Sequence, residues 1–136
     1  MKKNAIPDFI VIDDDDINNI ICDRILQMTF PGVSVQTFID PELGLEYIQA
    51  EYSKGDANNA VLFLDINMPV LSGWDVLDRL GHFSRFVTAH IKIFMLSSSI
   101  DPQDKKRAIR NPLVSNYMSK SLSHDKLKRL FPDIIM

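Results

Sequence analysis

Short apolar runs alternate with amphipathic stretches along this chain. The first run, Phe9-Ile10-Val11-Ile12, is short and rich in β-branched residues, which is typical of a strand buried on both faces. The spacing of the isoleucines that follow, from Ile17 to Ile25, and of Met28 predicts a helix that Pro31-Gly32 ends. Four more strands are predicted over residues 33–38, 60–64, 91–96 and 114–118, and four more helices over about 41–53, 73–81, 102–110 and 125–131.

Five strands, each followed by a helix, predict an α/β fold with a doubly wound parallel sheet and helices on both faces. Right-handed crossovers place the carboxyl ends of all strands at one edge, where such folds bind their ligands. The length of 136 residues suits one domain, and no linker or repeat interrupts the pattern.

Charge is unevenly distributed along the chain. Residues 1–100 carry 7 bases and 14 acids, whereas residues 101–136 carry 8 bases and 4 acids. This basic quarter is too interspersed with acids for a nucleic-acid patch, so we expect either a protein-docking face or a solvated helix surface.

Three further features bear on location. Cys22 is the single cysteine, which excludes an internal disulfide and favours a reducing cytoplasm, and we expect this side chain in the core. No apolar segment approaches the roughly 20 residues of a membrane span, and the first residues lack the pattern of a signal peptide. We therefore expect a soluble cytoplasmic protein without a membrane or nucleic-acid partner.

Polar residues follow the strands at the predicted ligand-binding edge. Asp13-Asp14-Asp15-Asp16 comes directly after the first strand, Asp65 ends the third, Ser97 the fourth and Lys120 the fifth. The second strand ends in Asp40, for which the sequence suggests no partner. Carboxylates, a hydroxyl and an ammonium from four strand ends should therefore converge on one crevice.

That set of groups predicts phosphoryl chemistry. Adjacent carboxylates repel one another unless a cation neutralises them, and Mg²⁺ prefers carboxylate oxygens together with phosphate. An aspartate beside Mg²⁺ can accept a phosphoryl group, whose oxygens a lysine and a hydroxyl then hold. Each element alone has a simpler explanation: the acidic run as a loop with a helix cap, Ser97 as a strand-end hydroxyl, and Lys120 as a surface charge.

Four segments resemble the receiver domain of bacterial two-component response regulators, of the stand-alone, chemotaxis-regulator-like kind. They are residues 9–16, residues 64–69 (Leu-Asp-Ile-Asn-Met-Pro) with Gly73, residues 95–97 and residues 117–120. The resemblance implies a flavodoxin-like (βα)5 fold with strand order 2-1-3-4-5. It also implies a single receiver domain over residues 1–136 with no output domain.

The resemblance also implies a role for each matching residue. Asp65 would be the phosphoacceptor, and Mg²⁺ would be held by Asp14 directly, by Asp13 through water, by Asp65, and by the Asn67 backbone carbonyl. Ser97 and Lys120 would bind the phosphoryl oxygens. Ser97 and Tyr117 would form the switch, although a packed strand aromatic explains Tyr117 equally well.

Two positions depart from the family pattern. Lys120 is followed by Ser121 instead of proline, and a cis bond before a non-proline residue costs roughly 2.5–4 kcal/mol, so the direction of Lys120 stays open. Residues 112–114 replace the small-residue turn before the last strand, which leaves the geometry of the helix at 102–110 open.

The leading functional hypothesis is phosphoryl transfer from a histidine kinase or histidine phosphotransfer protein to Asp65. Such a receiver catalyses only its own phosphorylation and dephosphorylation. It would signal through a basic face built from residues 102–110, 114–118 and 125–131, as a monomer or a weak phosphorylation-dependent dimer. Two alternatives are an aspartate-nucleophile phosphatase, with the pair Asp13 and Asp15, and a pseudo-receiver that serves only as a binding scaffold.

Overall fold

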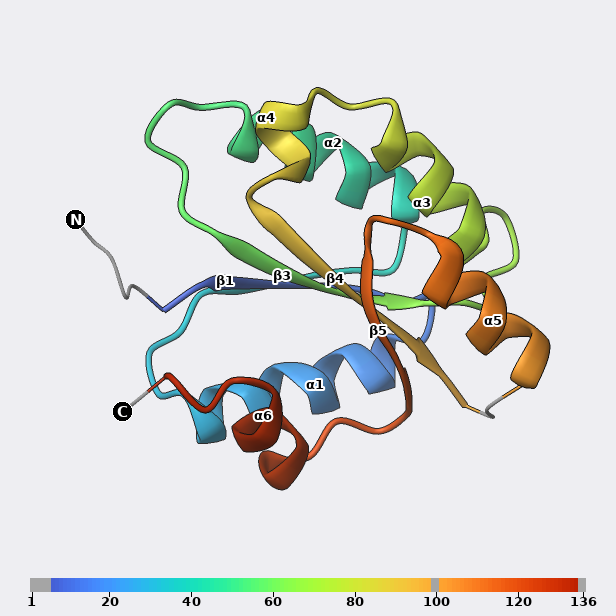
Figure 1. Ribbon diagram of the computed structural model, residues 1–136. Coiled ribbons are helices and arrows are strands. Elements are labelled where there is room, and N and C mark those ends of the chain that lie inside the picture. The colour runs from blue at the N-terminus through green and yellow to red at the C-terminus, as the bar shows by residue number, and fades with distance from the viewer. Residues whose placement is uncertain (1–5, 99–100, 135–136) are drawn as a thin grey trace.

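The apolar runs form strands and the amphipathic stretches form helices, as Figure 1 shows in a computed structural model of the chain. The structure describes residues 6–98 and 101–134, so residues 1–5, 99–100 and 135–136 of the predicted domain lie outside it. The elements are β1 (Asp8–Ile12), α1 (Asp16–Thr29), β2 (Val35–Phe38), α2 (Pro41–Tyr52), β3 (Ala60–Asp65), α3 (Gly73–Gly81), α4 (Arg85–Thr88), β4 (Ile91–Ser97), α5 (Pro102–Arg110), β5 (Val114–Ser119) and α6 (His124–Leu130).

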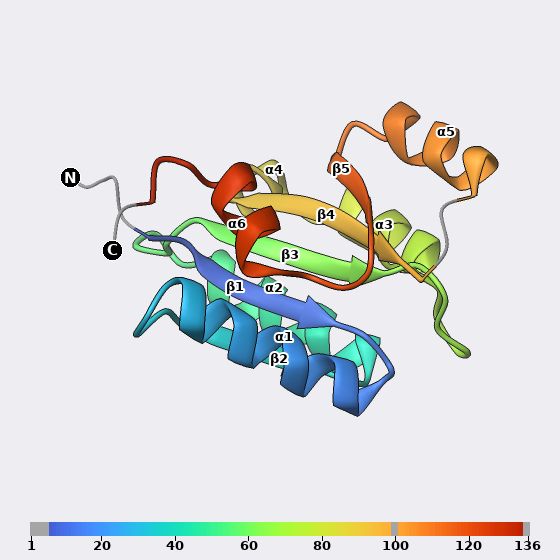
Figure 2. The same cartoon turned by 90° about the horizontal axis from the view of Figure 1, so that it is seen from below.

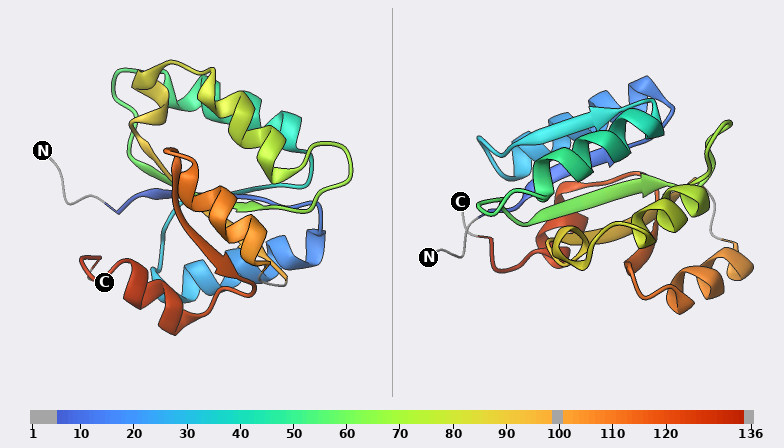
Figure 3. Two further views of the ribbon diagram at one scale, coloured as in Figure 1. Left: turned by 45° about the vertical axis from the view of Figure 1, so that its right-hand side comes forward. Right: turned by 90° about the horizontal axis from the view of Figure 1, so that it is seen from above.

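All strand pairs are parallel, and the order β2-β1-β3-β4-β5 confirms the predicted fold class and topology. Helices α1 and α6 cover one face of the sheet, and α2, α3, α4 and α5 lie on the other (Figures 1 and 3). The carboxyl ends of the strands meet at one edge, while the described chain begins and ends near the opposite one (Figure 1).

The sheet separates two hydrophobic cores because successive residues of a strand point to opposite faces. In β1, Ile10 and Ile12 belong to the core beneath α2 and α3, whereas Phe9 and Val11 belong to the core beneath α1 and α6. Phe9 stacks on Phe30 with ring centroids 5.8 Å apart. Both cores are continuous along the sheet, which holds the strand ends in fixed relative positions.

Polar N-caps set where the helices begin. The Asp15 side chain accepts from the backbone N–H of Ile17 and of Asn18, and Asp40 caps α2 by accepting from Glu42 N–H. Capping satisfies backbone donors that a helix start would otherwise leave unpaired. Asp40, for which no partner is apparent in the sequence, and Asp15 thus have structural roles as helix caps.

The face of α1 that packs on the sheet is not the face whose isoleucine spacing predicts this helix. Ile17, Ile20 and Met28 are at least half exposed, at 69%, 50% and 77%. The buried residues of α1 are Asn18, Asn19, Cys22, Leu26 and Thr29. Cys22 lies in the core as expected, but the hydrophobic spacing alone selects the wrong side of the helix.

Helix α4 is the element that the sequence pattern does not predict. It spans four residues, which is too short for a hydrophobic period, and it begins where the Ser84 hydroxyl accepts from Val87 N–H. Within the described residues no helix combines the length and the apolar character that a membrane span requires.

Helix α5 projects beyond the sheet (Figure 2) and buries only Ala108. Its contacts with the rest of the domain include the Arg107 guanidinium, 4.3 Å from the centroid of the Trp74 ring in α3, and Asp101 N–H, which donates to Tyr117 Oη over 3.4 Å. Apart from Ala108 and the partly buried Asp104, the side chains of α5 are exposed, so this helix presents most of its surface to solvent.

Candidate functional site

Three carboxylates meet at the edge where β1 and β3 end. Asp13 follows β1 and is 1% exposed, Asp65 is the last residue of β3 and is 4% exposed, and Asp14 is exposed to solvent. Each offers an oxygen, and these oxygens all lie within 4.8 Å of one another. The predicted convergence of these three residues is therefore present in the structure.

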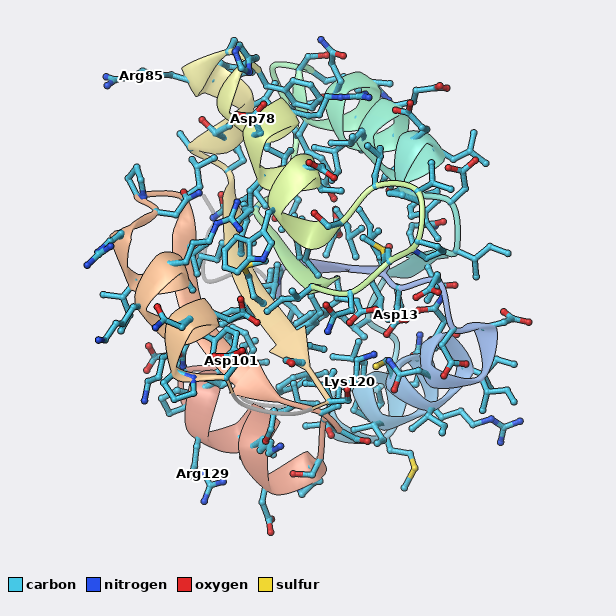
Figure 4. The ribbon with its side chains drawn as sticks, turned by 90° about the vertical axis from the view of Figure 1, so that its right-hand side faces the viewer. Asp13, Asp78, Arg85, Asp101, Lys120 and Arg129 are labelled. Atoms are coloured by element: carbon cyan, nitrogen blue, oxygen red, sulfur yellow. The ribbon has the colours of Figure 1, made fainter. Side chains whose placement is uncertain are left out.

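Lys120 reaches this cluster from the end of β5. Its Nζ lies 2.8 Å from Asp13 Oδ2 and 3.2 Å from Asp65 Oδ1 (Figure 4 labels Asp13 and Lys120). The Lys120 backbone N–H donates to Ser97 C=O over 2.8 Å, and the Lys120–Ser121 peptide bond is cis. The direction of Lys120, which the departure from Lys-Pro left open, is thus into the carboxylate cluster.

The Asp13 carboxylate has donors on both oxygens. Oδ1 accepts from Asp15 N–H at 2.9 Å, and Oδ2 accepts from Asn18 Nδ2 and from Lys120 Nζ, each at 2.8 Å. Asn19 Nδ2 donates to the Asp13 backbone carbonyl over 2.9 Å. Neither asparagine stands out in the hydrophobic pattern of the sequence. The signal that points to them is the carboxylate after a fully buried strand, which requires donors that the first turn of the next helix can supply.

Burial and charge change the acidity of the site. Burial, together with the charge of Asp13, raises the pKa of Asp65 to about 6, although Lys120 opposes the shift. Burial lowers the pKa of Lys120, but the hydrogen bond to Asp13 and the charges of Asp13 and Asp65 outweigh it and raise the pKa. Burial, and then the charge of Asp13, raises the pKa of the Cys22 thiol to about 11, which keeps that group protonated and unreactive.

The remaining predicted residues lie around the same edge. The backbone N–H of Asn67 donates to the Asp65 carboxylate. Ser97 is 1% exposed at the end of β4, directly after Leu96, the residue paired with Asp65. Tyr117 is 8% exposed and packs in the core beneath α3, so in this structure the ring is a buried strand aromatic tied to the start of α5.

The donor set fits a hard divalent cation. Three carboxylate oxygens this close together, two of them on buried residues, match the oxygen ligands that Mg²⁺ accepts, and a single ammonium shared between two carboxylates leaves negative charge uncompensated.

The predicted basic residues spread over several directions. Arg107 faces Trp74, Lys126 donates to the backbone carbonyls of Ser119 and Ser121, and Lys128 lies over the Phe30 ring at 5.8 Å. Among the basic residues of the described C-terminal part, 101–134, the exposed cations without such contacts are Lys105, Lys106, Arg110 and Arg129.

Comparison with known proteins identifies the family. The model of the response regulator receiver domain matches residues 9–131. A two component response regulator from Cytophaga hutchinsonii has 29% identity and a TM-score of 0.83, covering 93% of this chain and 95% of that one. A response regulator receiver protein from Dyadobacter fermentans has 28% identity and a TM-score of 0.80, covering 93% of this chain and 98% of that one.

A third relative is a probable methanogenesis regulatory protein, FilR2, from Methanothrix harundinacea. It is 28% identical over 95 residues, which are 70% of this chain and 59% of that protein. The chain thus spans about three-fifths of the length of this curated relative.

A doubly wound sheet with an acidic cluster and a lysine at its carboxyl edge is the arrangement expected of a receiver domain, and the family match agrees with it. The chain belongs to the response regulator receiver family of two-component signalling. Receiver domains bind Mg²⁺ through an acidic cluster such as the one formed by Asp13, Asp14 and Asp65.

Proposed function

We propose that this chain accepts a phosphoryl group on Asp65 from a phosphohistidine donor and signals through the resulting change of surface. The observation that carries this proposal is the position of Lys120 Nζ between the carboxylates of Asp13 and Asp65. An ammonium within 3.2 Å of the acceptor oxygen is placed to hold the charge of an incoming phosphoryl group.

In the transfer, an ionised Asp65 oxygen forms a bond to phosphorus while the bond from phosphorus to the donor imidazole breaks. The imidazole nitrogen keeps the electron pair and takes up one proton. Lys120 and the Ser97 hydroxyl hold the phosphoryl oxygens. Mg²⁺ would be held by Asp14, Asp65 and the Asn67 carbonyl, with Asp13 through water, and it supplies the positive charge that lets a phosphate dianion approach the carboxylates.

Labelling tests the acceptor. Acetyl phosphate or a phosphohistidine donor should label the protein only with Mg²⁺ or Mn²⁺, and Asp65→Asn should abolish labelling. Asp78→Asn is the matched control, since Asp78 is an exposed aspartate of α3 away from the cluster (Figure 4). If Asp65→Asn is labelled normally while Asp13 or Asp14 variants are not, Asp65 is not the phosphoacceptor and the proposal is wrong.

The phosphatase alternative has less support. Its acid/base would be Asp15, whose carboxylate caps α1, and its nucleophile would be Asp13, whose oxygens already accept three hydrogen bonds. We therefore propose that the chain is not a turnover enzyme and catalyses only its own phosphorylation and dephosphorylation. Sustained hydrolysis of a generic aryl phosphate would contradict this proposal.

For the phosphodonor protein we propose the exposed isoleucine face of α1 as the docking surface. Ile17, Ile20 and Ile21 are 69%, 50% and 42% exposed on the helix that starts beside the carboxylates. Ile20→Asp should slow transfer from a phosphohistidine protein yet leave labelling by acetyl phosphate unchanged. Ile109→Asp, at another exposed isoleucine, in α5, is the control and should change neither rate.

For the output we propose a protein partner at α5, β5 and α6, bound by a monomer or by a weak phosphorylation-dependent dimer. The exposed cations Lys106 and Arg129 favour an acidic partner surface and a salt-sensitive association. The double charge reversal Lys106→Glu with Arg129→Glu should weaken that association while Asp65 labelling continues. If labelling is lost and association kept, this surface serves the phosphodonor instead.

A further inference from the structure

The first turn of α1 presents two amides to the sheet instead of apolar side chains. Asn18 is 8% exposed and Asn19 is 2% exposed. Asn19 Nδ2 donates to the Asp13 backbone carbonyl at 2.9 Å and approaches Phe38 C=O at 3.5 Å, so it holds the chain at the ends of β1 and β2. Asn18 does something different, because its amide donates to the Asp13 carboxylate itself.

Among the described residues, Asp13 Oδ2 accepts from two donors that differ in how far their side chains can move away from it. Asn18 Nδ2 is fixed on α1, where its other close contact is Cys22 Sγ at 3.6 Å. Lys120 Nζ sits at the end of a flexible side chain and is shared with Asp65. When Lys120 is drawn toward a phosphoryl group on Asp65, Asp13 Oδ2 keeps Asn18 as its donor in the described residues.

We infer that Asn18 is a positioning residue for phosphoryl capture: it keeps the buried Asp13 carboxylate hydrogen-bonded so that Lys120 is free to move to the phosphoryl oxygens. The inference rests on the proposed phosphorylation of Asp65. Asn18 touches neither donor nor phosphoryl group and acts through Asp13 and Lys120.

This role has a selective consequence. Without the Asn18 amide, Lys120 remains the donor to Asp13 Oδ2, and its departure would leave this buried oxygen without a side-chain donor from the described residues. Binding of Mg²⁺ alone does not require Lys120 to leave Asp13. Loss of Asn18 should therefore weaken capture of the phosphoryl group far more than binding of the metal.

The test uses beryllofluoride, a tetrahedral stand-in for the phosphoryl group, with the full chain. Asn18→Leu removes the donor at nearly constant volume, and Asn18→Ser serves if the leucine variant does not fold. The control is Asn58→Leu, which removes an amide that donates to Ile6 C=O and to Asp8 at the opposite end of β1. Affinities for Mg²⁺ alone and for beryllofluoride with saturating Mg²⁺ are measured by thermal shift and by the fluorescence of Trp74, the single tryptophan.

For Asn18→Leu we expect beryllofluoride affinity and the acetyl phosphate labelling rate to fall about tenfold, the size of one hydrogen bond to a charged group. Its Mg²⁺ affinity should change less than about threefold, and Asn58→Leu should alter neither affinity. Equal losses for metal and beryllofluoride would mean that Asn18 only maintains local structure, and unchanged values would mean that it does nothing; both overturn the inference. A wild-type chain that binds beryllofluoride but is not labelled by any donor would overturn the proposed function. The effect of Asn18→Leu on beryllofluoride affinity would still test the inference about Asn18.

Discussion

Replacement of Gly73 by alanine should damage the site through the backbone of β3. Gly73 is the first residue of α3, and its N–H donates to Ile66 C=O over 2.8 Å. A Cβ at this position would lie 2.6 Å from the Asp65 carbonyl oxygen and 2.9 Å from Ile66 Cα. Both are backbone atoms, so the start of α3 and the end of β3 must move apart.

The magnitude follows from two opposed contributions. Forcing one extra carbon into a packed site costs typically about 1–3 kcal/mol. Alanine returns up to about 1 kcal/mol, because it lowers the entropy of the unfolded chain and favours the helix. We expect Gly73→Ala to lower the free energy of unfolding by about 1–2 kcal/mol, which in a domain of this size is a fall in melting temperature of several degrees.

Two other glycines provide matched controls. In Gly44→Ala the new Cβ would approach the Ile12 side chain at 2.7 Å, and the end of a side chain can shift. In Gly55→Ala it would meet nothing within 4 Å. Urea unfolding should rank the variants with Gly55→Ala the most stable and Gly73→Ala the least.

The labelling rate separates a local effect from a general one. Because Gly73 contacts the backbone of Asp65 itself, its alanine variant should be labelled several-fold more slowly at a temperature where all three variants are folded. Gly44→Ala and Gly55→Ala should be labelled at the wild-type rate. A Gly73→Ala protein that unfolds and labels like Gly44→Ala would refute the reasoning from backbone contact.

Three further outcomes are expected. Millimolar Mg²⁺ should raise the melting temperature, because it relieves a repulsion present only in the folded site, and Asp14→Ala should abolish that response in a thermal-shift titration. Without metal, the free energy of unfolding should fall as pH rises from about 3.8 to about 6, since the raised pKa makes native Asp65 bind more protons than the unfolded chain over that range; urea titrations should show that Asp65→Asn flattens this slope. Tyr117→Phe removes the acceptor of the Asp101 N–H, so hydrogen exchange of amides in the first turn of α5 should quicken while global stability changes little.

The strand ends could be predicted from sequence because burial on both faces leaves an unmistakable apolar run, and parallel topology then fixes which edge the next residue occupies. Asp13, Asp65 and Lys120 were found in this way. Asn18 and Asn19 were not found, because the hydrophobic spacing along α1 indicates that the isoleucine side faces the sheet. The asparagines face it instead, because the buried Asp13 requires hydrogen-bond donors.

Other misses have equally specific causes. Helix α4 depends on one capping serine and four residues, which is below the length at which periodicity carries information. The direction of Lys120 depends on the geometry of the loop that follows it, and Ser121 in place of proline carries no conformational signal of its own.

The solvent exposure of α5 has a consequence for the partner surface proposed there. The core constrains Ala108, and the contact with Trp74 constrains Arg107, but most other positions of this helix face solvent. These exposed positions belong to neither hydrophobic core nor the carboxylate cluster, so we expect substitutions there to alter a partner surface without altering the site. Under the proposed output role of α5, two such proteins in one cell could select different partners through the exposed residues of this single helix.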